Sequence, residues 1–392
     1  MSAPGIALAG LGAVAPAQFT TGPERPLRLR SGAQLAPVTQ VYETYGTLDA
    51  ERSNAILLFH ALSGSQHAAG YCEAVPEAGE RWTEECAIGW WDGFVGPGRA
   101  LDTNRYCVIC ANYVGGCYGS TGPASIDPAT GRPYGSRFPQ LSLADIVDAQ
   151  VRLLDHLGIR RLHAAIGASL GGLLCLSLAT RYPDRVGVVV PIAAGVEVTP
   201  LQRLHNLEQI VAIRSDAAFH GGDYYDGPGP ALGLALARMI AHKTYVSLHT
   251  LDERARLEVV QPDQGLAPYR VHHPLESYIL HQGRKFVRRF DANTYLRITE
   301  AWQGFNLAAE GGTGTLDELF GRCRKQRYLI FTIDSDVCFY PEEQEELARL
   351  LKEAGVRCMR ITVHSEKGHD AFLLEPELFT PHLAYALNAG SE

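Results

Sequence analysis

No stretch of the 392-residue sequence reaches the roughly 18 consecutive apolar residues of a membrane-spanning helix, so we expect no membrane partner. Residues 1–20 are mildly apolar but lack a charged beginning, which argues against a signal peptide. An excess of positive charge is missing as well, because 43 acidic and 35 basic side chains give a net charge of -8. Without a basic field, binding to nucleic acid or to an anionic membrane surface is not expected.

The cysteines form no even-numbered framework, because nine of them are scattered along the chain. This usage suits a reducing compartment better than a disulfide-bonded protein, so we expect a cytoplasmic location. Cys107 and Cys110 are close in sequence, within the apolar, strand-like run 106–110. Residues three apart on a strand point to opposite faces, so this pair predicts neither a metal site nor a redox site. We expect no metal ion in the protein.

The chain is organised around the sequence G-A-S-L-G at positions 167–171. The short apolar run 162–166 before it suits a buried strand, and the helical composition of 170–181 follows it. Strand, sharp turn and helix together are typical of a nucleophile elbow, in which the small flanking residues let the strand and the helix approach each other. The pattern predicts Ser169 as a nucleophile whose hydroxyl lies beside the positive end of a helix.

The pattern on both sides of the elbow predicts a mostly parallel, doubly wound α/β sheet. A helix over 142–157, with a capping serine at its start and a glycine after its end, leads directly into the strand before Ser169. The other buried strands are predicted at 54–59, 186–192, 328–333 and 356–363, with a further helix at 341–354. At the N-terminus we expect a flexible lead-in over residues 1–25. An antiparallel pair of strands is predicted at 26–30 and 38–45.

The alternation of strand and helix stops between positions 195 and 321. This segment is polar and rich in histidine and arginine, with helical patterns at 200–214, 231–247, 275–290 and 293–303. Because it lies between two predicted sheet strands, we expect an inserted helical lid. The domain prediction is an α/β-hydrolase core in two parts, 1–194 and 322–392, with the lid at 195–321.

The side chains that would activate the serine follow it in the order Ser…Asp…His, which is the chain order of α/β-hydrolases. Asp336 follows one predicted strand and His369 follows the next, so both should lie at the same sheet edge as Ser169. The imidazole would take and return the serine proton, and the carboxylate would fix its tautomer. Asp334 and His364 are rivals, but both lie closer to the strand ends, so placement favours Asp336 and His369.

The loop after the strand at 54–59 reads His60-Ala61-Leu62-Ser63-Gly64. In α/β-hydrolases one oxyanion-hole N–H comes from an early strand-end loop, and the other comes from the residue after the nucleophile. The backbone N–H groups of Leu62 and Leu170 are therefore the predicted oxyanion donors. His60 is interpreted as part of this loop rather than as the catalytic base.

Longer segments of the chain form a second and more specific pattern. Besides the elbow they are V-Y-E-T-Y-G-T-L (41–48), H-A-L-S-G (60–64), G-W-W-D-G-F-V-G-P-G (89–98), N-Y-V-G-G-C-Y-G-S-T-G-P-A-S-I-D-P-A-T-G-R-P-Y-G (112–135), A-R-M-I-A-H-K-T-Y (237–245), S-D-V-C-F-Y-P (335–341) and G-H-D-A-F-L-L-E (368–375). Together they resemble the homoserine O-acetyltransferases of the α/β-hydrolase fold, over nearly the whole chain from about position 41.

The resemblance implies that Ser169, Asp336 and His369 form a triad. It implies ping-pong transfer of acetyl from acetyl-CoA, through an acyl-serine, to the side-chain hydroxyl of L-homoserine, in methionine biosynthesis. Acetyl-CoA would be a co-substrate, and no cofactor would be bound. Arg238 and Asp370 match the homoserine-binding pair of that family. A cytoplasmic homodimer with a helical lid over a deep tunnel is also implied.

Two motifs depart from the usual pattern of that family. The elbow has A-S-L where G-S-M is usual, which keeps a small residue, the nucleophile and an apolar residue in order. Cys338 stands two residues after Asp336, where members that use succinyl-CoA often carry arginine. A neutral Cys338 leaves no obvious partner for a succinyl carboxylate. The alternatives that stay open are a homoserine or serine O-succinyltransferase and an ester or thioester hydrolase with the same triad.

Overall fold

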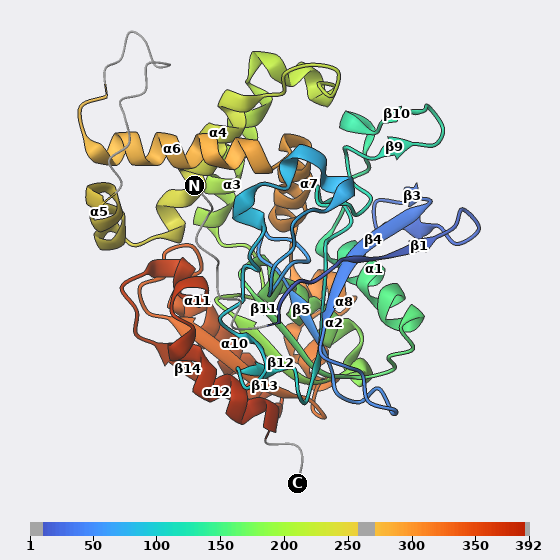
Figure 1. Cartoon of the computed structure of the whole chain (residues 1–392). Coiled ribbons are helices and arrows are strands. Elements are labelled where there is room, and N and C mark those ends of the chain that lie inside the picture. Colours follow the sequence, from blue (N-terminus) through green and yellow to red (C-terminus); the bar gives the residue numbers. More distant parts are fainter. Residues whose placement is uncertain (1–10, 258–270, 389–392) are drawn as a thin grey trace.

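An eight-stranded sheet forms the centre of the computed structural model, which describes residues 11–257 and 271–388 (Figure 1). Its strands lie in the order β1 (Ala17–Thr21), β4 (Val38–Tyr45), β8 (Cys107–Ala111), β5 (Ala55–Phe59), β11 (Leu162–Ala168), β12 (Val186–Ile192), β13 (Arg327–Ile333) and β14 (Arg357–Val363). The pairs β1–β4 and β4–β8 are antiparallel, and every later pair is parallel. The predicted fold class, a mostly parallel doubly wound α/β-hydrolase sheet, is confirmed.

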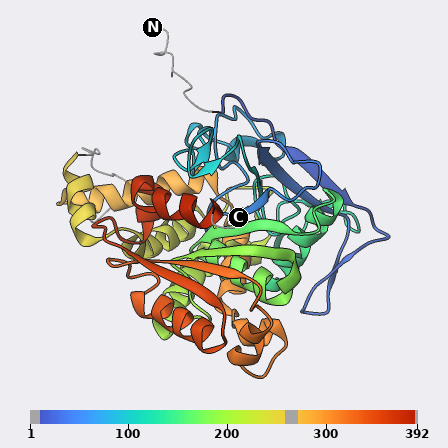
Figure 2. The same cartoon turned by 90° about the horizontal axis from the view of Figure 1, so that it is seen from below.

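The inner strands are buried on both faces, which is why they read as nearly continuous apolar runs. Figure 2 shows the strands as a middle layer with helices on either side. The helices that flank the sheet are α1 (Leu143–His156), α2 (Leu170–Arg181), α10 (Pro341–Glu353) and α12 (Pro376–Asn388). At the start of α1, Ser142 and Asp145 form a reciprocal capping box, as the sequence predicts. None of the helices within 11–257 and 271–388 combines the length and the apolar character needed to cross a membrane.

The N-terminal pairing differs from the prediction. β4 pairs with β1, so that Ala17 lies opposite Tyr42, and not with residues 26–30. Those residues contribute β2 (Leu27–Arg28), which forms a short ribbon with β3 (Gln34–Leu35). The prediction of a flexible lead-in is wrong for β1, whose side chains are mostly exposed and therefore show no hydrophobic pattern. The first ten residues of that lead-in lie outside the described residues.

The described residues between β12 and β13 are mostly helical. The helices are α3 (Pro200–Arg214), α4 (Ala231–Tyr245), α5 (Leu248–Leu257), α6 (Pro274–Arg289), α7 (Ala292–Gln303), α8 (Leu307–Gly311) and α9 (Leu316–Gly321). The four predicted helices form with nearly the predicted bounds, whereas α5, α8 and α9 were not predicted. In Figure 1, α3, α4, α6 and α7 lie above the sheet, and α4 packs against both α3 and α6. The domain bounds at 194 and 321 remain a prediction.

Candidate active site

Ser169 lies at the sharp turn between β11 and α2, with φ 58° and ψ -127°. This backbone conformation is unfavourable for a residue with a side chain and costs about 1–3 kcal/mol. Hydrogen bonds hold it in place: the Ser169 N–H donates to the Ile192 carbonyl (2.9 Å), and the N–H groups of Gly172 and Leu173 donate to the Ser169 carbonyl (2.8 and 3.2 Å). The strain is therefore maintained by β12 and by the first turn of α2.

Two glycines beside Ser169 are required by close backbone contacts. A Cβ atom on Gly171 would lie 2.4 Å from the carbonyl oxygen of Phe59, at the end of β5. A Cβ atom on Gly167 would lie 2.3 Å from the carbonyl oxygen of Gly171. Any side chain at these positions would push α2 away from the sheet. This is the approach of strand and helix that the G-x-S-x-G sequence predicts.

His369 and Asp336 form a buried pair at the ends of β14 and β13. The Nδ1 atom of His369 lies 2.6 Å from Oδ2 of Asp336. The Oδ1 atom accepts hydrogen bonds from the N–H groups of Cys338 (2.7 Å) and Phe339 (2.9 Å). Nδ1 therefore carries a proton, and Nε2 is the acceptor. Nε2 is buried and has no hydrogen-bond partner in the described part of the chain.

Opposing influences act on the pKa of His369. Burial acts to lower it, but the Asp336 carboxylate, with smaller contributions from Asp370 and Glu343, raises the pKa above 6.5. The ring of Phe339 stacks on the imidazole at a centroid distance of 5.5 Å. Carboxylate and ring together fix the orientation of the imidazole.

Ser169 and His369 line one cavity of about 240 Å³. Its wall is built from the loop after β5, the loop before Trp90, helices α4 and α6, and the turn after β14. Among the residues that line it are Leu62, Ser63, His67, Trp90, Tyr118, Arg238, Tyr245, Arg289 and Asp370. The structure thus brings the predicted nucleophile, base and acceptor residues to one place, with Asp336 joined to them through His369.

Leu62 and Leu170 are the predicted oxyanion-hole donors, and of the two only Leu62 is among the described residues that line the cavity. Leu62 belongs to the loop after β5, and Leu170 is the first residue of α2. Within 11–257 and 271–388, no backbone acceptor pairs with either N–H. Unpaired donors at a helix N-terminus are suited to a developing negative charge.

Arg238, on α4, and Asp370, next to His369, also line the cavity. Neither has an ion-pair partner within 4.0 Å among the described residues. The guanidinium of Arg238 lies over the rings of Tyr245 and Phe286, at 5.3 and 5.0 Å. Burial raises the pKa of Asp370, while His369 and Arg238 act in the opposite direction. An unpaired cation and an unpaired anion in one cavity suit a ligand that carries both charges.

Sequence reasoning missed Arg289, at the end of α6, which lines the same cavity. Its Nη1 donates to the Ser63 carbonyl (3.1 Å) and to the Tyr118 hydroxyl (3.2 Å), and no carboxylate pairs with it among the described residues. Burial acts to lower the pKa of Arg289, but Tyr118 and nearby thiols raise it above its usual value. No local signal separates Arg289 from the exposed Arg288 beside it.

The rival residues lie away from this cavity. His60 is buried against Tyr113, at a ring-centroid distance of 3.6 Å, and burial lowers its pKa to about 4. His364 is exposed and pairs with Asp334 at 2.8 Å on the protein surface. Neither histidine lines the cavity that contains Ser169.

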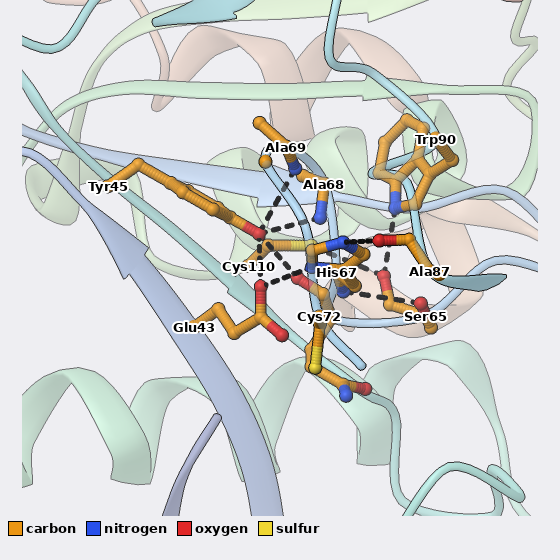
Figure 3. Close-up of polar contacts among 12 residues, drawn as sticks. Glu43, Tyr45, Ser65, His67, Ala68, Ala69, Cys72, Ala87, Trp90 and Cys110 are labelled. Atoms are coloured by element: carbon orange, nitrogen blue, oxygen red, sulfur yellow. Dashed lines mark hydrogen bonds and ion pairs between the residues drawn. The ribbon is translucent and has the colours of Figure 1, made fainter. Parts of the chain in front are cut away.

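Glu43, His67 and Cys72 are the described residues whose donor atoms lie close enough together to be considered for a metal ion, all within 4.8 Å of one another (Figure 3). Both ring nitrogens of His67 are already hydrogen-bonded, to Glu43 (2.8 Å) and to the Ala87 carbonyl (3.1 Å). The Cys72 thiol donates to the Ala74 carbonyl, and burial, followed by Glu43, raises its pKa to about 11. These contacts fit a buried ion pair better than a set of metal ligands.

Similarities to known proteins agree with this geometry. Residues 54–376 match the family model of the alpha/beta hydrolase fold. A homoserine O-acetyltransferase of Solidesulfovibrio magneticus is 42% identical over 90% of this chain and 86% of its own length. A homoserine O-succinyltransferase of Magnetococcus marinus is 43% identical over 94% of this chain and 91% of its own. The crystal structure of homoserine O-acetyltransferase from Bacillus anthracis has a TM-score of 0.84 and 27% identity, covering 96% of this chain and 98% of that one.

Proposed function

We propose that this chain, which belongs to the homoserine O-acetyltransferase family of the α/β-hydrolase fold, is itself a homoserine O-acetyltransferase. It transfers the acetyl group of acetyl-CoA to the side-chain hydroxyl of L-homoserine, a step of methionine biosynthesis. The observation that carries the proposal is one cavity lined by a strained serine, by the histidine of a buried His–Asp pair and by two unpaired side chains of opposite charge.

In the first half-reaction, the Ser169 hydroxyl oxygen attacks the thioester carbonyl of acetyl-CoA. Nε2 of His369 takes the hydroxyl proton and then gives it to the leaving sulfur, so that free CoA and acetyl-Ser169 result. Asp336 keeps the proton on Nδ1 and stabilises the imidazolium that forms. The N–H groups of Leu62 and Leu170 hold the oxyanion, which is worth a few kcal/mol of barrier.

In the second half-reaction, L-homoserine enters with its carboxylate at Arg238 and its ammonium group at Asp370. The planar guanidinium can meet a carboxylate with two parallel hydrogen bonds. Because Asp370 immediately follows His369, the substrate is anchored beside the base. His369 removes the proton of the homoserine hydroxyl, the hydroxyl oxygen attacks the acetyl carbonyl, and Ser169 leaves with the returned proton.

The helical segment 195–321 acts as a lid in this proposal. Arg238 from α4 and Arg289 from α6 both reach the cavity wall, so the segment closes the side of the site that the sheet leaves open. A transferase has to keep water away from its acyl-enzyme, whereas a hydrolase with the same triad admits it. The lid therefore favours transfer over the hydrolase alternative.

We also propose a cytoplasmic homodimer. Support for the homodimer comes from an exposed apolar face on two of the lid helices, made of Leu201, Leu204, Leu207 and Val211 on α3 and Leu232 and Leu236 on α4. Apolar patches of this kind are typical of surfaces that another copy of the chain covers. All nine cysteines are free in the structure, which is consistent with a reducing compartment.

Loss of the proposed homoserine contact at Arg238 or at Asp370 is expected to impair transfer to homoserine selectively. Arg238→Ala and Asp370→Asn should each lower kcat/KM for homoserine by about 30-fold or more, because removing one partner of a buried charge pair costs roughly 2–5 kcal/mol. The homoserine KM should rise, and kcat should fall through misplacement of the hydroxyl. Single-turnover acetylation by acetyl-CoA should be nearly unchanged. Arg288→Ala, which removes an exposed arginine of α6, is the control. If acylation falls as far as transfer does, the two residues are not an acceptor clamp.

The acyl donor is expected to be acetyl-CoA rather than succinyl-CoA, by about 10²-fold or more in kcat/KM, which corresponds to about 2.7 kcal/mol. Cys338 is buried, and burial raises the pKa of its thiol well above the usual value, so it stays neutral and offers no partner to a succinyl carboxylate. The measurement is CoA release from acetyl-CoA and succinyl-CoA in the presence of homoserine, serine or neither. Equal or reversed efficiency for the two donors would contradict the prediction and point to Arg289 as the carboxylate partner, which Arg289→Gln would then test.

A further inference from the structure

The loop that carries the Leu62 N–H has no regular structure of its own. Residues 60–70, here called the β5 loop, contain neither helix nor strand, yet five of them besides Leu62 line the cavity: Ala61, Ser63, Gly64, Ser65 and His67. A hydrogen-bond donor in an oxyanion hole contributes only when it is aimed correctly at the oxygen. A turn bond from the Gly64 N–H to the Ala61 carbonyl (3.0 Å) shapes the loop around Leu62, and contacts from outside the loop hold this turn in place against the cavity.

Two side chains of β4 supply such contacts (Figure 3). The Tyr45 hydroxyl accepts a hydrogen bond from the Ala68 N–H (2.6 Å) and lies 2.6 Å from Oε2 of Glu43. Burial, followed by the charge of Glu43, raises the pKa of Tyr45 well above its usual value, so the hydroxyl keeps its proton and donates it to Glu43. The same Oε2 atom lies 2.8 Å from Nδ1 of His67. Glu43 and Tyr45 thus hold both the backbone and a side chain of the β5 loop.

The Glu43–His67 contact is buried and joins a carboxylate to an imidazole. Nδ1 of His67 faces Oε2 of Glu43 (2.8 Å), and Nε2 faces the Ala87 carbonyl (3.1 Å), so both ring nitrogens face acceptors. The two side chains are at most 1% exposed. Water therefore cannot replace either partner, and loss of one side chain leaves the other buried without its partner.

The same histidine connects the ion pair to the cavity wall. The backbone N–H of His67 donates to the Ser65 hydroxyl (3.2 Å). The Ser65 carbonyl accepts a hydrogen bond from the Trp90 indole (2.9 Å). Ser65, His67 and Trp90 all line the cavity. A shift of His67 would therefore move the part of the cavity wall that the β5 loop forms, which includes Leu62.

We propose that the Glu43–His67 ion pair, together with Tyr45, is a positioning element for acyl transfer that aims the Leu62 N–H at the acyl carbonyl oxygen. Neither charged residue contacts the reacting atoms, and both act through the β5 loop. The proposal rests on the proposed function, because it requires an acyl carbonyl in the cavity.

The test is the variant Glu43→Gln, which keeps the side-chain shape and removes the charge. Loss of one well-aimed oxyanion donor costs about 10²–10³-fold, so we expect the rate of Ser169 acylation and kcat to fall by about 10²-fold. KM for homoserine should stay at its wild-type value, unlike in Arg238→Ala. Rates are normalised to the fraction of active sites, taken from the burst of CoA release.

A second measurement separates positioning from a general loss of stability. The rate of acylation by acetyl-CoA is compared with the rate of acylation by its dithioester analogue, in which sulfur replaces the carbonyl oxygen. Sulfur is a poorer hydrogen-bond acceptor, so an intact oxyanion hole favours the oxygen compound, and Glu43→Gln should lose much of that preference. The control is Glu310→Gln, because Glu310 is also a buried carboxylate but bonds Ser177 (2.7 Å) and Ala144 (3.1 Å), away from the cavity. It should lower Tm without changing the preference.

An unchanged preference in Glu43→Gln, at the wild-type acylation rate per active site, would overturn the positioning role. If Glu43→Gln does not fold, the same preference measured on Tyr45→Phe decides the question. A divalent metal ion bound at one per chain, whose removal by a chelator abolishes acylation, would also overturn it. A wild-type protein that acetyl-CoA does not acylate would instead refute the proposed function, so the two failures are distinguishable.

Discussion

Ser169→Ala is expected to lose on the order of 10³-fold or more in kcat while the fold stays intact. The triad acts as a unit, so removing the nucleophile leaves only the contributions of binding and of the oxyanion hole. Alanine keeps the Cβ atom, and the backbone bonds that hold the elbow come from Ile192, Gly172 and Leu173. The turn should therefore form as before, and its strain should be unchanged.

Intact-mass spectrometry after incubation with acetyl-CoA alone provides the direct measurement. The wild-type protein should carry one acetyl adduct, and Ser169→Ala should carry none. The control is Ser177→Ala, which changes another buried serine of α2. The Ser177 hydroxyl bonds Glu310 outside the cavity, so this variant should keep the adduct. An adduct that persists in Ser169→Ala would show that another residue is the nucleophile.

The elbow and the sheet could be predicted because their signals are local. Gly167 and Gly171 flank the serine within one five-residue motif, and the inner strands are apolar because helices cover both faces. β1 could not be predicted in this way, because it is an edge strand whose side chains are mostly exposed. Its place depends on pairing with β4, which no local pattern encodes.

The site was predictable to the extent that its residues follow strand ends. Asp336 and His369 are placed by the parallel sheet, so the order of strands brings them near Ser169. Arg289 and the Glu43–His67 pair were missed because their roles arise from contacts between distant segments, such as α6 with Ser63 and β4 with the β5 loop. Arg238 came from the resemblance alone, since nothing in its helix distinguishes it from other lid arginines.

Asp336→Asn is expected to lower kcat by about 10³–10⁴-fold, because the amide can hold the imidazole in the wrong tautomer. In the wild-type protein the Asp336 carboxylate accepts a hydrogen bond from Nδ1 of His369 (2.6 Å). This leaves Nε2 of His369 as the proton acceptor. An asparagine whose amide group donates to Nδ1 would move the proton to Nε2, where it blocks removal of the serine proton. The Cys338 and Phe339 N–H groups can still donate to the amide oxygen, which favours this orientation.

The same variant should move the acidic limb of the pH profile in a defined direction. The active form has neutral His369, so kcat/KM for acetyl-CoA falls as the pH drops below the pKa of this histidine, which Asp336 holds above 6.5. Without the Asp336 carboxylate, burial is the largest influence on the pKa of His369, so this pKa falls. The acidic limb of the profile therefore shifts to lower pH, and the maximal kcat/KM is much lower than in the wild type. Asp334→Asn is the matched control, because that carboxylate pairs with the exposed His364, and its profile should equal that of the wild type. A limb that stays in place or moves to higher pH in Asp336→Asn would mean that the titrating base is not the imidazole bonded to Asp336.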